Sequence, residues 1–461
     1  MSLVSISVAA DILYKYNQYY TDPDLETMLL SISKELVRPY FFSNYSNINN
    51  NSVLFYDGFG LDKRGIALIM CKAILNRGYK LIYVSPKENK FKQPVFFKEI
   101  RGKNVVFEFY SNVGRKLNRI NLLSSFFQKH HPKLAFFYST PNDVAGCCVF
   151  NALKDIVFRY QIDLTDHAFW LGVNAFDICN GGRPFSASIQ HYYRGIPKEK
   201  ISMLDASLFV EDCQFQGLPF DESKKFVFSG GQLYKTLGDK NNTYYKIVGH
   251  ILKYHSDVLF LYAGSGDDAM LRRLEERFPE RVYHINERPD FFQIIKRCTL
   301  YLNTYPMFGG LMMRYAALAG KLPLTLKHNS DSDGILIDQQ SRNIEYNSYD
   351  ELVTDLDRLL SDNDYLKYRE KKLQGSVVTN ECFERNIQLM IEEHRTEFPV
   401  IQIKKINTDR FREEFLDRFD FLDIYNSIAQ FSNLMLIRFF PVEFIKGIQY
   451  KIFRKIKGCF K

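Results

Sequence analysis

Short apolar runs alternate with segments of helical spacing along most of this chain, and this alternation restricts its fold more than any other feature. Val53–Asp57 is an apolar run typical of a buried parallel strand, and a loop with three glycines follows it. Ile66–Asn76 then has helical spacing, and Lys80–Ser85 is a second strand-like run. A strand, a helix and a strand in this order predict a parallel sheet with a right-handed crossover.

The same alternation continues through the first half of the chain. The further predicted elements are strands at Asn104–Tyr110, Lys133–Tyr138 and Asp155–Leu164, and helices at Asn118–Gln128 and about Val144–Leu153. Such a series predicts a doubly wound layer, whose ligands bind at the carboxyl ends of the strands. Asp143 and His167 follow two of these strands, so we expect both at the ligand-facing edge.

A second series of the same kind begins at Phe226, after a strand and crossing connection at Lys200–Gly217. Its predicted strands are Phe226–Phe228, Val258–Ala263, Val282–Ile285 and Leu300–Asn303, and its helices are Tyr244–Tyr254, Asp268–Arg277 and Asp290–Arg297. We therefore predict an α/β chain of two Rossmann-like domains, 53–205 and 206–395, that face each other across a cleft. Residues 1–52 are expected to be a helical, partly irregular leader that ends in an asparagine-rich loop, and 396–461 a helical tail.

Composition is consistent with a protein of two such domains. The 461 residues are 46% hydrophobic and 25% charged, with a formal net charge of +8. The eight cysteines show no CxxC pair, so we expect reduced thiols in a reducing compartment. Met1 is followed by neither a basic n-region nor a long apolar segment, and we find no apolar stretch long enough to span a bilayer. These features favour a cytoplasmic protein.

Two glycine-led turns carry most of the functional signal. Phe226–Lys235 reads FVFSGGQLYK, an apolar run that breaks into Ser229, Gly230 and Gly231 and is followed by Lys235. Glycines let the backbone approach a bulky anion, and a cation in the next turn neutralises diphosphate charge.

The second turn is YPMFGGLMMRYAALAGKLP, in which Gly309 and Gly310 open a predicted helix and Gly320 closes it before Pro323. Two such turns at strand ends predict a nucleotide-diphosphate site. Either pair alone is also compatible with an ordinary tight turn.

The second half of the chain resembles GT-B glycosyltransferases, in particular the group 1, family 4-like enzymes of bacterial surface polysaccharide synthesis. The motifs that carry the resemblance are SGGQLYK (229–235), YAGSGDD (262–268), DFFQIIKRCTLYLNTYP (290–306), FGGLMMRYAALAGKLPL (308–324) and DGILID (333–338), the last expected as a short hairpin. The first half matches through GFGLDKRG (58–65), STPND (139–143) and TDHAFWLG (165–172). The resemblance implies an N-terminal acceptor domain and a C-terminal donor domain.

The chain departs from that family at two positions. The family usually holds two glutamates around the second glycine turn, whereas the corresponding residues here are Met307 and Tyr315. This departure weakens the expectation of a retaining mechanism. Arg314 is a candidate cation for the diphosphate, with a solvated helix arginine as the alternative.

The resemblance also implies which groups bind the rest of the donor. Arg288, in the loop NERP (286–289), is a candidate contact for the nucleobase. We expect no cofactor and no metal, because backbone amides, helix N-termini and basic side chains stabilise the leaving diphosphate in such sites. The segment Asp331-Ser332-Asp333 looks like a DxD metal motif but lies after the nucleotide helix, so we interpret it as a solvated turn.

Transfer of a sugar to a hydroxyl also needs a group that takes the proton. His167 is the first candidate for this general base, and Asp62 and Asp143 are its rivals. A structural hydrogen-bonding role for His167 is the alternative.

The last 28 residues combine cations with apolar residues at helical spacing. Residues 434–461 carry seven Lys or Arg against one acid, Glu443. A cationic amphipathic helix of this kind binds the interface of an anionic bilayer, with a helix that packs on the core and a nucleic-acid patch as alternatives.

Together these features predict a cytoplasmic, membrane-peripheral hexosyltransferase that uses a nucleotide sugar. We expect a lipid-linked or growing glycan as acceptor, in capsule, O-antigen or lipopolysaccharide synthesis, and no nucleic-acid partner. The alternatives are a protein-glycosylating transferase and a catalytically degenerate scaffold that binds a nucleotide sugar. A dehydrogenase is disfavoured because no GxGxxG follows the first strand.

Overall fold

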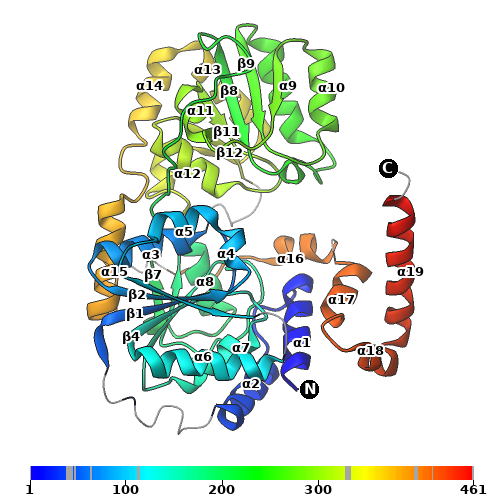
Figure 1. Cartoon of the computed structure of the whole chain (residues 1–461). Coiled ribbons are helices and arrows are strands. Elements are labelled where there is room, and N and C mark those ends of the chain that lie inside the picture. The colour runs from blue at the N-terminus through cyan, green and yellow to red at the C-terminus, as the bar shows by residue number, and fades with distance from the viewer. Residues whose placement is uncertain are drawn as a thin grey trace. The chain divides into compact units, whose positions relative to one another are not determined.

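The computed structural model describes residues 2–37, 45, 48–62, 65–111, 115–327, 334–398, 403–417 and 419–458 (Figure 1). The chain divides into two compact units. The first unit comprises residues 1–205 and 384–461, and the second comprises 206–383. The first boundary, after Asp205, is the one expected from the sequence. The chain returns to the first unit at Glu384, whereas the sequence analysis expects the second domain to end at residue 395.

The first unit is built on a parallel sheet of seven strands in the order β3-β2-β1-β4-β5-β6-β7. The strands are β1 (Asn49–Asp57), β2 (Lys80–Pro86), β3 (Val105–Tyr110), β4 (Pro132–Tyr138), β5 (Phe158–Ile162), β6 (Ile178–Gly181) and β7 (Ile201–Met203). The order reverses between β1 and β4, which is the switch point where doubly wound sheets bind ligands.

Helices cover both faces of this sheet (Figure 1). They are α3 (Ile66–Asn76), α4 (Asn89–Lys92), α5 (Pro94–Ile100), α6 (Lys116–His130), α7 (Val144–Ala152) and α8 (Pro184–Tyr192). Alternate residues of β1 point to opposite faces, so Leu54 and Tyr56 pack with α6 and α7 while Val53 and Phe55 are buried on the face of α3 and α5. Both faces are apolar, as a central parallel strand requires.

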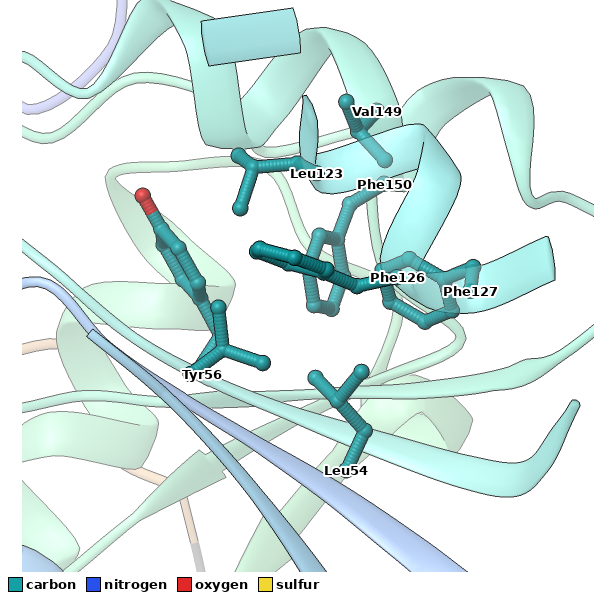
Figure 2. A pocket seen from close by; sticks show the side chains of 8 residues that line it. Leu54, Tyr56, Leu123, Phe126, Phe127, Val149 and Phe150 are labelled. Atoms are coloured by element: carbon teal, nitrogen blue, oxygen red, sulfur yellow. The ribbon is translucent and has the colours of Figure 1, made fainter. Parts of the chain in front are cut away.

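An apolar pocket lies between this sheet and helices α6 and α7 (Figure 2). Its lining residues are Leu54, Tyr56, Val84, Leu123, Phe126, Phe127, Val149 and Phe150. The pocket has no room for a water molecule. It is therefore a packing defect of the core and not a substrate site.

The second unit contains a parallel sheet of six strands in the order β10-β9-β8-β11-β12-β13. The strands are β8 (Lys225–Gly230), β9 (Val258–Ala263), β10 (Val282–Ile285), β11 (Leu300–Leu302), β12 (Pro323–Leu326) and β13 (Glu345–Tyr346). Six helices pack on it: α9 (Thr243–Tyr254), α10 (Ala269–Arg277), α11 (Phe291–Arg297), α12 (Gly310–Leu318), α13 (Tyr349–Ser361) and α14 (Asn363–Lys371). Its switch point lies between β8 and β11, the strands that precede the two glycine turns.

The two ends of the chain pack together on the first unit. The terminal helices are α1 (Ser2–Tyr16), α2 (Pro23–Leu36), α15 (Asn380–Glu393), α16 (Asp409–Leu416), α17 (Phe421–Ile428), α18 (Asn433–Phe439) and α19 (Pro441–Gly458). Helices α16 and α17 contact α1, and α19 packs on α17 and α18 (Figure 1). Ser427 of α17 donates to Asp11 of α1 at 2.6 Å, and Lys15 donates to both of these side chains. The predicted leader and tail are thus parts of one helical layer.

The structure corrects the sequence reading in three places. The asparagine-rich run was expected to be a loop, but β1 begins at Asn49, because the backbone of this run pairs with the neighbouring strand β4. Strand β6 and helix α8 were missed, since both are short and follow an irregular segment. The expected hairpin at 333–338 is absent from the described residues 334–338, which form turns, and Asp333 lies outside the described residues.

One buried acid gives the first unit a testable pH dependence. Glu26 of α2 accepts a hydrogen bond from the backbone of Gly172 at 2.7 Å, and burial raises the pKa of its carboxyl from 4.5 to about 7. Between these values the folded chain keeps a proton that the unfolded chain has lost, so the Glu26 contribution makes the protein less stable as the pH rises.

We therefore expect Glu26→Gln to remove part of this pH dependence. The wild-type free energy of unfolding should fall, relative to that of the variant, by up to about 3 kcal/mol between about pH 5 and about pH 8. Urea unfolding at both pH values measures this difference. Equal pH slopes in the two proteins would show that Glu26 titrates normally in the fold.

Candidate active site

The first glycine turn of the second unit is fixed by contacts between three strands. Ser229 is fully buried at the end of β8, and its hydroxyl donates to the Leu302 carbonyl of β11. Gly231 follows with φ +133°, a conformation that side chains disfavour, and its NH donates to Ala263 of β9 at 2.9 Å. The turn thus leaves the sheet directly at the switch point.

A second glycine is needed for the turn to close. A Cβ atom on Gly264, the first residue after β9, would lie 1.8 Å from the carbonyl oxygen of Gly231. Such an approach is available only to glycine. Gly264 of the motif YAGSGDD therefore leaves room for the backbone of Gly231 in the motif SGGQ.

The two glycine turns meet. Lys235 lies in a short 3₁₀ helix, Leu233–Thr236, and its carbonyl accepts a hydrogen bond at 3.1 Å from the backbone NH of Met307. On the same side, a Cβ atom on Gly230 would lie 3.1 Å from the side chain of Met312 in α12. The loops after β8 and β11 therefore form one surface at the carboxyl edge of this sheet.

Helix α12 starts within that surface. Gly309 is its N-cap, and a Cβ atom there would lie 2.8 Å from Oδ1 of the buried Asn303. A Cβ atom on Gly310 would lie 2.8 Å from the ring of Phe308. Glycine at both positions lets the chain pack closely at the positive end of the helix, a type of helix end that can bind a phosphate.

Two predicted donor-binding cations have other partners in the second unit. Arg314 donates to the carbonyl of Ala206, and its neighbour Tyr315 donates to the carbonyl of Phe209 at 2.6 Å. Arg288 forms two hydrogen bonds to Asp290, at 2.8 and 2.5 Å, and Asp290 is fully buried. Both arginines thus hold segments of the fold in place.

Asp290 is ionised by this arrangement. Burial alone would raise the pKa of its carboxyl, but the Arg288 guanidinium and the backbone NH of Gln216 outweigh it and lower the pKa below its usual value. The pair stabilises the loop that precedes α11, on the side of the sheet where the nucleobase was expected.

In the first unit, Asp143 is the centre of a buried polar network. It caps α7 by accepting from Gly146 at 3.0 Å, and it accepts from the hydroxyls of Ser139 and Tyr56 at 2.6 and 2.7 Å. Arg119 of α6 lies 3.0 Å away and also donates to Tyr56. Burial would raise the pKa of the Asp143 carboxyl, but Arg119 and these donors together lower it. Asp143 is therefore a carboxylate whose acceptor sites are occupied.

Asp62 and Asp57 both stabilise the glycine loop after β1. Asp62 accepts from Phe96 and Val95 at 2.7 and 3.3 Å and so holds the first turn of α5. Asp57, which the sequence analysis did not single out, accepts from the backbone NH groups of Phe59 and Gly60. Burial raises the pKa of the Asp57 carboxyl.

His167 lies in the loop that follows β5. Its Nδ1 is 3.5 Å from Asp166, its side chain is about one-third exposed, and its ring is 6.1 Å from that of Phe415. Asp166 is itself held by two hydrogen bonds from Arg183, at 2.7 and 3.0 Å. Burial opposes ionisation of Asp166, but Arg183 and the neighbouring His167 lower the pKa of its carboxyl. A carboxylate at Nδ1 orients an imidazole so that Nε2 is its basic nitrogen.

The loops that carry Asp143 and His167 are joined by their backbones. Leu171 NH donates to the Pro141 carbonyl at 2.9 Å, and Cys147 Sγ lies 3.3 Å from the Leu171 carbonyl. The structure thus brings the β4 and β5 exits together at one edge of the first sheet.

Comparison with known proteins identifies the architecture. No protein-family model matches the chain, and a search of curated proteins gives no match. A glycosyltransferase from Rickettsia africae is 12% identical, with 77% of this chain and 100% of that chain covered and a TM-score of 0.54. An O-GlcNAc transferase variant from Thermobaculum terrenum is 13% identical, with 89% and 78% covered and a TM-score of 0.52. The fold is GT-B. A putative UDP-N-acetylglucosamine 2-epimerase from Listeria monocytogenes, 11% identical with 75% and 96% covered and a TM-score of 0.54, resembles the chain equally well.

Within this GT-B chain, the glycine turns were the part of the site that the sequence could indicate. Ser229, Gly230, Gly231, Lys235, Gly309 and Gly310 come together as expected of neighbouring loops, and their binding role stays a prediction. The partners of the remaining candidates were missed. Arg119, Asp166 and Arg183 are examples, because each meets its partner only through the fold.

Among the residues that the structure describes, His, Cys, Asp and Glu side chains form no group of three or more that could hold a metal ion. Residues Asp331 to Asp333, the DxD-like segment, lie outside the described residues.

Proposed function

We propose that this chain is a glycosyltransferase that moves a sugar from a nucleotide-diphosphate donor to a glycan or lipid-linked acceptor. The observation that supports this most is the junction of two glycine turns at the carboxyl edge of the second sheet, through the hydrogen bond between Met307 and Lys235. This junction places the backbone of both glycine turns and the N-terminus of α12 on one surface. Group 1, family 4-like membership and a role in capsule, O-antigen or lipopolysaccharide synthesis belong to the same proposal.

The donor half of the mechanism depends on charge that develops on the leaving diphosphate. Backbone NH groups at Gly230, Gly309 and Gly310 and the ammonium of Lys235 would stabilise it, and Gly231, whose NH is held by Ala263, would keep the turn in place. This chemistry requires no metal. We propose a metal-independent enzyme on that basis.

The acceptor half depends on a base that removes a proton from the attacking hydroxyl. His167 fits this role best, because Asp143 and Asp62 already accept two or more hydrogen bonds each. Asp166 would act as a positioning residue that keeps Nδ1 protonated.

A screen of nucleotide sugars tests the proposal. Purified protein with each donor and a mixed glycan or lipid-linked acceptor should release a nucleoside diphosphate, and release should persist when a chelator removes divalent metals. Lys235→Ala should abolish nucleotide binding. Binding without turnover would favour a degenerate scaffold, and isomerisation of the sugar without an acceptor would identify an epimerase instead.

The tail supports a peripheral position on the inner face of the cell membrane. Within the described part of the chain, none of the helices combines the length and apolar character needed to cross a bilayer. On α19, Val442, Ile445 and Ile448 recur at intervals of three and are 56%, 56% and 41% exposed. Gly447 instead faces α17, where a Cβ atom would lie 1.9 Å from the Tyr425 ring. An exposed apolar strip beside lysines suits an anionic lipid interface.

We expect Ile445→Asp with Ile448→Asp to lower the membrane-bound fraction about tenfold, because two apolar side chains leave the interface and two negative charges repel it. Cell fractionation measures the effect, and Met28→Asp, at an exposed apolar position of α2, is the matched control. Substitution tests membrane binding more specifically than deletion of 434–461. Leu436 packs on Val8 and Ile428, so deletion would also expose these core residues. Unchanged sedimentation with membranes would contradict the anchor.

A further inference from the structure

The two ends of the chain both contact His167. Asn17, which follows α1, is fully buried and donates to the backbone carbonyl of His167 at 2.9 Å. Phe415 of α16 lies beside the imidazole, with the two ring centres 6.1 Å apart and the ring planes inclined by 35°. The candidate base is therefore contacted by segments that lie outside the seven-stranded sheet and its connections.

A buried arginine holds the backbone on both sides of His167. Arg194 donates to the carbonyls of Thr165 and Ala168 at 3.2 and 2.6 Å, and its guanidinium lies 4.5 Å from the centre of the Trp170 ring. With the main chain fixed in this way, the freedom that remains to His167 is rotation about its side-chain bonds.

Asp166 restrains that rotation only in part. Its Oδ1 lies 3.5 Å from Nδ1 of His167, which is longer than the usual N–H···O hydrogen bond of about 2.7–3.2 Å. Both oxygens of Asp166 also accept from Arg183, at 2.7 and 3.0 Å, so the carboxylate is oriented by the arginine. Its charge favours a proton on Nδ1, but the angle of the imidazole depends on a further contact.

Phe415 supplies a contact of this kind. Ring centres of aromatic pairs in contact lie about 4.5–7 Å apart, and the 6.1 Å between Phe415 and His167 is within this range. A ring packed beside the imidazole blocks part of its rotation. Because a phenyl ring has no hydrogen-bonding atom, it does so without occupying either nitrogen of the histidine.

Helix α16 is anchored on the segment that follows α1. Gln18 donates through its side chain to the carbonyl of Arg412 at 2.9 Å, and the Arg412 guanidinium donates to the carbonyl of Gln18 at 3.2 Å. Phe419, just after α16, packs on Tyr16 with ring centres 5.2 Å apart. Residues three apart share one face of a helix, so the anchor at Arg412 directs Phe415 to the same side. The place of Phe415 is thus set by two separate contacts.

We propose that Phe415 is a positioning residue that holds the imidazole of His167 in one orientation. This makes the C-terminal tail part of the candidate acceptor site as well as a membrane anchor. The consequence for turnover rests on the proposed function, in which His167 is the base. The orientation of the ring does not depend on that function. An apolar cover that leaves the imidazole free to rotate is the alternative.

Histidine resonances of the full-length chain test the orientation without a substrate. The chain has nine histidines, and the Cε1–H signal that disappears in His167→Ala is the one from His167. Phe415→Leu should move this signal, because the ring current of Phe415 is lost and other rotamers become populated, while the other histidine signals stay in place. Leu416→Ala, at an exposed position of the same helix, is the matched control and should move none of them.

Turnover gives the second measurement. Phe415→Leu should lower kcat about tenfold with the KM for the donor unchanged, since a small displacement of a reacting group is costly. Phe415→Tyr keeps the ring and should recover most of the rate. In a His167→Ala background, Phe415→Leu should have no further effect, because it acts through His167.

Two results would overturn the inference. One is a His167 signal that Phe415→Leu leaves in place. The other is a wild-type kcat in Phe415→Leu when His167→Ala is impaired. A wild-type rate in His167→Ala would instead contradict the base role, and the resonance measurement would still decide whether Phe415 orients the ring.

Discussion

Replacing His167 by alanine is expected to lower turnover about 100-fold or more, because general-base catalysis contributes a factor of that size. The substitution should leave the conformation of the loop unchanged. The loop is held by the backbone carbonyl of His167, which accepts from Asn17 at 2.9 Å and does not depend on the imidazole. A fall in kcat with little change in donor binding is therefore the expected result.

The controls separate a base from a structural histidine. His191, in the same unit, contacts the carbonyl of Ile196 through Nδ1 at 3.0 Å, and His191→Ala should leave turnover nearly unchanged. Asp166→Asn should shift the pH profile of kcat as well as its height, since it removes the charge beside Nδ1. If His167→Ala turns over at the wild-type rate, the histidine is structural and the proton leaves by another route.

Most of the sheet strands could be predicted because each is a short apolar run bounded by turn residues. Val258–Ala263 and Val282–Ile285 were placed with their observed ends, since a glycine or a polar or charged residue stops the run on each side. Strand β6 shows the limit of this signal. Its sequence, ICNG, is too short to show alternation, and only pairing with β5 and β7 makes it a strand.

The glycine turns were predictable as turns, but the reason for Gly264 was not. In the sequence Gly264 is one of two glycines in a loop after a strand, whereas in the fold it faces the carbonyl oxygen of Gly231. A close approach between residues of different loops leaves no mark on local spacing. The same holds for Arg314, whose hydrogen bond to Ala206 joins segments 108 positions apart.

Buried charge pairs were the least predictable part of the site. Arg119 and Asp143 are 24 positions apart, on the first turn of one helix and the cap of the next, and neither position looks unusual in the sequence. Their pairing nevertheless gives a prediction with a large expected effect on stability.

We expect Arg119→Met to lower the free energy of unfolding by about 3–5 kcal/mol at neutral pH, because it leaves the Asp143 carboxylate, 1% exposed, without its cation. The methionine keeps most of the apolar stem of the arginine, so the loss arises mainly from charge. Urea unfolding of the two proteins measures the difference.

The pH dependence of that loss distinguishes charge from packing. In the wild type the pKa of Asp143 lies below its unfolded value of 3.8, so its contribution to stability is present above that value and is lost as the pH falls through the lower, folded pKa. Without Arg119 the largest influence that lowers this pKa is gone, so the folded pKa of Asp143 should be higher in the variant than in the wild type, and the variant should gain less stability as the pH rises. The two proteins should therefore differ least in acid.

The double variant Arg119→Met with Asp143→Asn should recover part of the loss at neutral pH, since no uncompensated charge remains buried. A loss that is equal at all pH values and additive in the double variant would mean that Arg119 only fills space.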